Sequence, residues 1–143
     1  MPKPIQNFIK FLGTAGARYV TTLQLRSSAG IWVEYAGTRL LIDPGPGTLV
    51  RANRSKPKLD LAKLDGVILT HRHVDHSCDA NVMIEAMTRG GSLRKGKVLA
   101  PSDALEEEPV VFNYVREYLD ELVPLQVGGR YSVGGLVLET PVL

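Results

Sequence analysis

Short apolar segments alternate with glycine- and proline-rich turns through the first third of the chain. Alternating apolar and polar positions predict β-strands, which we place at 8–12, 22–26, 31–35 and 38–43. Their close spacing favours an antiparallel meander with one buried face. The segment DPGPG at 43–47 ends this region, because proline lacks an N–H donor and cannot continue a strand. A short helix is predicted next, at 48–53.

The middle of the chain changes character at 66–70, where the compact apolar run GVILT is typical of a strand buried on both faces. Helical spacing of apolar residues predicts a helix at 80–89, with Asp79 placed to cap it or to favour its dipole. The remaining elements are predicted as a strand at 97–100, a helix at 109–120 and strands at 122–126, 130–133 and 136–140.

All three histidines of the chain fall between positions 71 and 76, in the pattern H-R-H-V-D-H. The pattern follows the apolar strand directly, where side chains can converge at the mouth of a pocket. Imidazole nitrogens and carboxylate oxygens are the ligands that Zn²⁺ takes at about 2.0–2.2 Å. His71 and His73 can point to one side of an extended segment, and a turn after them would bring Asp75 and His76 toward a second ion. The sequence therefore predicts a metal centre that activates water without a serine or cysteine nucleophile.

These residues resemble the metallo-β-lactamase superfamily, whose hallmark is H-x-H-x-D-H. Two other segments are similar to landmarks of the family: FLGT at 11–14 resembles the opening strand and glycine turn of the ribonuclease Z-like branch, and LIDPG at 41–45 resembles a strand that ends in an Asp beside the metals. The resemblance implies an α+β protein with the four-layer αββα sandwich. It also implies two zinc ions, with Mn²⁺ or Fe as alternatives.

Carried over to this sequence, the resemblance implies that His71 and His73 bind the first metal and that Asp75 and His76 bind the second. Asp75 would also be the catalytic proton acceptor. Asp43 would orient a ligand through a hydrogen bond, unless it only initiates the turn before Pro-Gly. The final histidine points toward hydrolysis of phosphodiesters, thioesters or lactones and away from antibiotic cleavage. Ser77-Cys78-Asp79 replaces the glycine pair of the glyoxalase branch, and we expect Cys78 to be a small buried packing residue.

The family fold usually exceeds 200 residues, and no histidine follows Ser77. We therefore expect one domain at 1–143 that supplies the N-terminal half of the sandwich and the start of the second half, and that is incomplete at its C-terminus. Its last strands would have unpaired edges and an apolar face without a partner sheet, so we expect it to form a homo-oligomer, to aggregate or to depend on a missing second half.

Hydrophobic residues make up 44% and charged residues 22% of the chain, which indicates a globular protein. The net charge of +2 lacks a dense basic run, so the charge pattern does not support a nucleic-acid partner, although the resemblance allows one. One cysteine excludes an internal disulfide. With no signal pattern and no apolar run of membrane length, we expect a cytoplasmic protein without a membrane partner.

Three functions compete on these observations. The first is metal-dependent hydrolysis of an ester, with a phosphodiester as the expected substrate and ribonuclease Z-type tRNA processing as a variant of it. The second is a non-catalytic metal-binding or interaction module on the same fold. The third is a di-iron oxidoreductase, which usually has a different carboxylate pattern and an added flavin domain.

Overall fold

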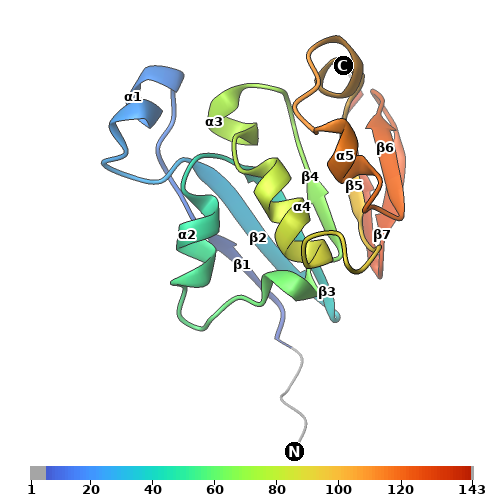
Figure 1. Cartoon of the computed structure of the whole chain (residues 1–143), viewed down its shortest axis with the longest axis horizontal. Coiled ribbons are helices and arrows are strands. Elements are labelled where there is room, and N and C mark those ends of the chain that lie inside the picture. Colours follow the sequence, from blue (N-terminus) through green and yellow to red (C-terminus); the bar gives the residue numbers. More distant parts are fainter. Residues whose placement is uncertain (1–5, 143) are drawn as a thin grey trace, which may run out of the picture.

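A computed structural model describes residues 6–142 and shows a six-stranded mixed sheet with helices on one face (Figure 1). The strands lie in sequence order: β1 Phe8–Phe11, β2 Ala29–Tyr35, β3 Thr38–Pro44, β4 Gly66–Ile68, β5 Lys97–Pro101 and β6 Glu121–Leu125. The first three form the expected antiparallel meander, and β3 to β6 pair in parallel. Parallel neighbours need crossover connections, and these connections carry the helices.

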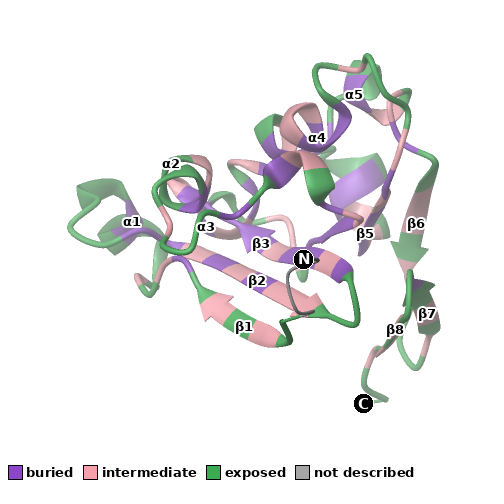
Figure 2. Cartoon of the chain, turned by 90° about the horizontal axis from the view of Figure 1, so that it is seen from below, coloured by how far each residue is buried: buried purple, intermediate pink, exposed green. Residues whose placement is uncertain are grey.

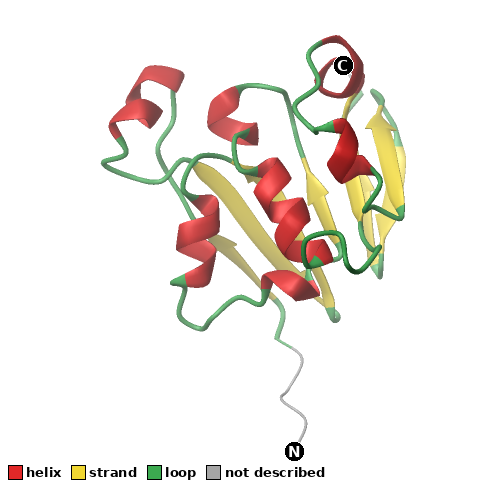
Figure 3. Ribbon diagram, in the orientation of Figure 1, coloured by secondary structure: helices red, strands yellow, loops and turns green. Residues whose placement is uncertain are grey.

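The helical segments are short, and they are seen against the sheet in Figure 3. They are α1 Arg18–Leu23, α2 Thr48–Asn53, the 3₁₀-helix η1 Leu61–Lys63, α3 Val74–Ser77, α4 Ala80–Thr88, the π-helix η2 Asp103–Glu107 and α5 Asn113–Arg116. A separate hairpin of β7 Arg130–Val133 and β8 Leu136–Glu139 lies beside β6 (Figure 2). Among residues 6–142, no helix combines the length and apolar character needed to cross a bilayer.

The core has two parts because alternate residues of each central strand face opposite sides of the sheet. Leu41, Val67 and Val98 are buried against the helices. Their neighbours Leu40, Ile68 and Leu99 form a second cluster with Val133 of the hairpin, on the other face. β4 is thus buried on both faces, as its apolar run predicted. Helices, sheet and hairpin correspond to the first two layers of an αββα sandwich and the beginning of the third, which confirms the predicted fold class.

Two predicted elements are wrong. The strand expected at 22–26 is absent, because α1 occupies residues up to Leu23 and Gln24 then turns left-handed at φ 47°. The apolar positions that suggested a strand are exposed here, with Leu25 83% accessible. The helix expected at 109–120 is shorter, since only Asn113–Arg116 is α-helical and the π-helix η2 precedes it.

Two side chains differ from their expected roles. Cys78 is exposed, so the prediction of a buried packing residue is wrong. Asp79 holds the N-cap position of α4 but makes no capping hydrogen bond there. Its carboxylate instead accepts a hydrogen bond from the backbone N–H of Leu49 in α2, at 2.9 Å. Burial raises the pKa of Asp79, while this hydrogen bond favours the charged form.

Candidate metal centre

The site lies at the carboxyl ends of β3 and β4, which are adjacent parallel strands. Because parallel strands end at the same edge of a sheet, Asp43 at the end of β3 lies beside Thr70 and His71, which follow β4. The backbone N–H of Thr70 donates to Asp43 Oδ1 at 2.7 Å, and the Thr70 hydroxyl donates to Asp43 Oδ2 at 2.6 Å. Asp43 therefore holds the start of the histidine segment against the sheet.

Asp43 itself has a left-handed backbone, with φ 50°, a conformation that aspartate tolerates better than most residues. The turn that follows packs tightly against α3. A Cβ atom at Gly45 would lie 2.0 Å from the carbonyl oxygen of Asp75 and 2.6 Å from that of Ser28. Only glycine fits at this position, so the DPGPG segment brings the two halves of the site into contact.

The hydrogen bonds around Thr70 determine which nitrogen of His71 is protonated. The Thr70 hydroxyl gives its single hydrogen to Asp43, so its oxygen accepts from His71 Nδ1, which lies 2.9 Å away. This assignment leaves the lone pair on His71 Nε2 free to bind a metal. Burial and the neighbouring His76 ring lower the pKa of His71, which favours the neutral, metal-binding form.

His76 is oriented by Asp43 directly, through the same carboxylate oxygen that accepts from the Thr70 hydroxyl. Its Nδ1 lies 3.1 Å from Asp43 Oδ2, and a carboxylate oxygen can only accept this hydrogen bond. The other ring nitrogen, Nε2, lies 3.6 Å from Asp75 Oδ2. Asp43 thus acts as the orienting carboxylate that was one of its two expected roles, and it leaves a free imidazole nitrogen next to the Asp75 carboxylate.

His73 is placed by the loop before α3. It precedes the first residue of that helix, and its carbonyl oxygen accepts hydrogen bonds from the Ser77 hydroxyl at 3.0 Å and from the backbone N–H of His76 at 2.9 Å. The ring of His73 lies edge-on to that of His71, with 4.8 Å between the ring centroids. The His71 and His76 rings are 4.3 Å apart.

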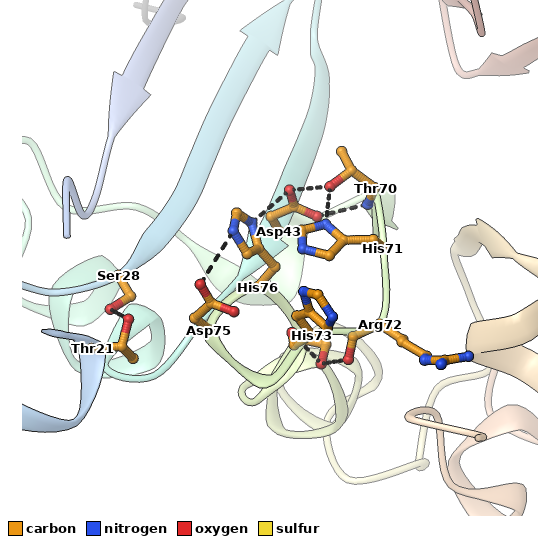
Figure 4. Close-up of polar contacts among 10 residues, drawn as sticks. Thr21, Ser28, Asp43, Thr70, His71, Arg72, His73, Asp75 and His76 are labelled. Carbon is orange, nitrogen blue, oxygen red and sulfur yellow. Dashed lines mark hydrogen bonds and ion pairs between the residues drawn. The ribbon is translucent and has the colours of Figure 1, made fainter. Parts of the chain in front are cut away.

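The four predicted ligands lie close together (Figure 4) and belong to two overlapping groups that share His71. One ligand atom from each of His71, His73 and Asp75 lies within 4.8 Å of the others, and the same holds for Asp43, His71 and His76. Asp75 is 6% exposed, and its Oδ1 atom is buried without a hydrogen-bond partner among residues 6–142. A buried carboxylate oxygen without a donor is unfavourable unless a cation completes it. The donor set and this orphaned oxygen fit a divalent metal such as zinc.

Arg72 is a feature of the site that the sequence pattern does not reveal. Its side chain points away from the imidazoles (Figure 4) and reaches the segment around η2. Arg72 Nη1 lies 3.2 Å from Asp103 Oδ2, and Arg72 Nε lies 3.1 Å from a carboxylate oxygen of Glu108. These ion pairs fasten the loop between His71 and His73 from its outer side. They join residues more than 30 positions apart, so no local signal could have indicated them.

Comparison with known proteins places this geometry in a family. The sequence model of the beta-lactamase superfamily domain matches residues 38–143. An uncharacterized protein of Methanocaldococcus jannaschii is 32% identical over 124 residues, which are 84% of this chain and 46% of that protein. The ribonuclease Z of Methanopyrus kandleri is 46% identical over 68 residues, which are 48% of this chain and 23% of the enzyme.

Solved structures share the fold. The metallo-beta-lactamase fold protein YhfI from Bacillus subtilis superimposes with a TM-score of 0.63 at 20% identity, over 88% of this chain and 48% of that one. The chain therefore spans about half the length, or less, of the relatives that it matches.

Proposed function

The chain belongs to the beta-lactamase superfamily, and on that premise we propose that it is a metal-dependent hydrolase whose substrate is a phosphodiester. The family is the one that the H-x-H-x-D-H pattern resembled, so that prediction is confirmed. The observation that carries the proposal is the convergence of the histidine and aspartate side chains, with Asp75 Oδ1 left without a hydrogen-bond partner among residues 6–142. Similarity to a ribonuclease Z supports the choice of a phosphodiester.

In the proposed centre, His71 and His73 would hold one zinc ion, and Asp75 and His76 would hold a second. When bound, zinc supplies a Lewis acid that polarises the substrate oxygen and activates water. Asp43 orients the His76 ring directly and the His71 ring through the Thr70 hydroxyl, which leaves both Nε2 atoms available to a metal. Asp75, placed against His76 Nε2, accepts the proton that the attacking water loses.

The test is hydrolysis of bis(p-nitrophenyl) phosphate with added Zn²⁺ or Mn²⁺, together with elemental analysis of the protein. We expect turnover and at least one equivalent of metal. Asp75→Asn should lower kcat by about 100-fold or more, the range of a general base. Glu117→Gln, an equally conservative change at an exposed carboxylate, is the matched control and should leave kcat unchanged.

Two results would contradict the proposal in different ways. Metal bound in full without turnover would exclude hydrolysis of this ester class and support a non-catalytic metal-binding module. Well under one equivalent of metal after gentle purification would exclude the metal centre itself.

A narrower version of the proposal is a ribonuclease Z-type endonuclease that processes tRNA, which the 46% identity to the Methanopyrus kandleri ribonuclease Z favours. It predicts cleavage of a precursor tRNA. Hydrolysis of the small diester combined with an intact precursor tRNA would reject this version and keep the broader one.

A further inference from the structure

A basic pocket is lined by residues of β1, of the segment after α1, and of α2 with the residues that follow it. These elements are labelled in Figure 1. Its volume is about 580 Å³, within the range of small-molecule sites. Three cationic side chains line it: Lys10 from β1, and Arg51 and Arg54 from α2 and its C-terminal end. None of its lining residues is an aspartate or glutamate.

The three cations have no anionic partner in the described part of the chain. Arg51 Nε donates to the Ser27 hydroxyl at 2.6 Å, which fixes the guanidinium while its two terminal nitrogens make no hydrogen bond or ion pair among residues 6–142. The Arg54 side chain likewise makes neither within those residues, and Lys10 Nζ donates only to the carbonyl oxygen of Lys56 at 2.8 Å. Arg51 and Arg54 are three residues apart and so lie on one face, where like charges repel each other.

Such an arrangement recognises an oxyanion. A guanidinium presents two parallel N–H groups that match the oxygens of a phosphate, and an ammonium adds a point charge. Binding an anion would also relieve the repulsion among the three cations, since the pocket holds no carboxylate to balance them.

The pocket adjoins the metal centre across a single turn. Gly47, at the end of the DPGPG segment, lines the pocket, while Asp43, at its start, orients His76. Ser27 lines the pocket, and the carbonyl oxygen of the next residue, Ser28, packs against the same turn near Asp75. The turn from Asp43 to Gly47 therefore connects the metal centre to the pocket.

We propose that this pocket binds a second phosphate of the substrate, distinct from the phosphodiester at the metal centre. The inference rests on the proposed hydrolase function and narrows its substrate to molecules with at least two phosphates, of which a polynucleotide strand is the occupant that we assign. The phosphate site itself depends only on Lys10, Arg51 and Arg54, so its binding can be measured whether or not the protein hydrolyses anything.

In the experiment, the protein is titrated with inorganic phosphate and, separately, with a short oligothymidylate, and binding is monitored by amide NMR. Each titration is carried out once with a metal chelator present and once on the protein as purified. We expect the Gly47 and Arg51 amide signals to shift. Arg54→Gln should raise the Kd for phosphate about tenfold. Lys58→Gln removes the same charge from an exposed residue outside the pocket and should change Kd by less than about twofold. Arg51→Gln provides an independent second variant.

The oligothymidylate should bind more tightly than inorganic phosphate. In Arg54→Gln, the slope of the logarithm of its binding constant against the logarithm of the salt concentration should become smaller by about one. Equal losses in Arg54→Gln and Lys58→Gln, or signal shifts confined to the histidine segment, would overturn the phosphate site. Phosphate binding at the pocket with no preference for the oligonucleotide would overturn the polynucleotide occupant. Absence of hydrolysis with intact pocket binding would reject the proposed function alone.

Discussion

Thr70→Val tests whether the Thr70 hydroxyl controls the metal-binding form of His71. Valine keeps the β-branched shape but removes the oxygen that lies 2.6 Å from Asp43 Oδ2 and 2.9 Å from His71 Nδ1. Asp43 keeps its hydrogen bonds from the Thr70 backbone and from His76, so it is not left unpaired. Since Thr70 is exposed, we expect the free energy of unfolding to fall by about 1.5 kcal/mol, the lower end for a hydrogen bond to a charged group.

The larger effect should be on metal affinity. Without an acceptor at Nδ1, the His71 ring loses both its orientation and its preference for one tautomer. Loss of such an orienting partner typically raises the metal Kd by about 10- to 100-fold, or about 1.4–2.7 kcal/mol. A chromophoric chelator in competition for zinc measures the Kd. Long-range ¹⁵N–¹H NMR measures the tautomer without overlap, because the chain has three histidines and all belong to the site.

Thr14→Val is the matched control, since Thr14 is exposed and its hydroxyl makes no hydrogen bond within residues 6–142. It should leave the zinc Kd and the imidazole spectra unchanged. The reasoning is refuted if Thr70→Val keeps the native Kd and a single Nδ1-protonated tautomer of His71, because the Thr70 hydroxyl would then have no orienting role.

Three further predictions concern the surroundings of the site. Gly45→Ala places a Cβ atom 2.0 Å from the backbone of α3, so the free energy of unfolding measured by thermal denaturation should fall by about 1–3 kcal/mol and zinc binding should weaken. The control Gly16→Ala meets nothing within 4 Å and should change neither quantity. Asp79→Ala removes the acceptor for the Leu49 N–H and should cost about 1 kcal/mol in urea denaturation, while Asp79→Asn, which keeps an oxygen acceptor, should cost clearly less. Burial lowers the pKa of His71 below 6.5, so below that pH the unfolded chain binds more protons than the folded protein. The free energy of unfolding of the metal-free protein should therefore rise with pH up to about 6.5. His71→Gln should flatten that rise, and an unchanged pH profile in this variant would contradict the prediction.

Most strands of the sheet were predicted from the sequence because their apolar side chains are the ones that the structure buries. β4, apolar throughout, is covered on both faces, and β3 alternates between the two core clusters. The pattern failed where apolar side chains are exposed. Val20, Leu23 and Leu25 are all more than 40% accessible, so their spacing follows no buried face. The segment expected as a strand at 22–26 instead holds the end of α1 and a turn.

The sequence predicted which side chains come together at the candidate site, but not the surroundings of the site. The H-R-H-V-D-H pattern is local, and the structure gathers all four predicted ligands; their assignment to two metal ions stays a prediction. The partners of Arg72 and Asp79 depend on tertiary contacts between distant residues, as do the three cations of the basic pocket, which are scattered between positions 10 and 54. The cytoplasmic location and the homo-oligomer also stay predictions.

The hydrogen bonds between Asp43 and Thr70 join residues 27 positions apart and close the parallel crossover from β3 to β4. Before β3 and β4 have paired during folding, the imidazoles of the segment from His71 to His76 lack the hydrogen bonds with Thr70 and Asp43 that orient them. Contacts between residues this far apart in the sequence form later than local ones, because the entropy of loop closure must be overcome first. The metal should therefore bind weakly before β4 has docked beside β3 and tightly afterwards. Zinc affinity measured at successive times during refolding should then report when β3 and β4 pair.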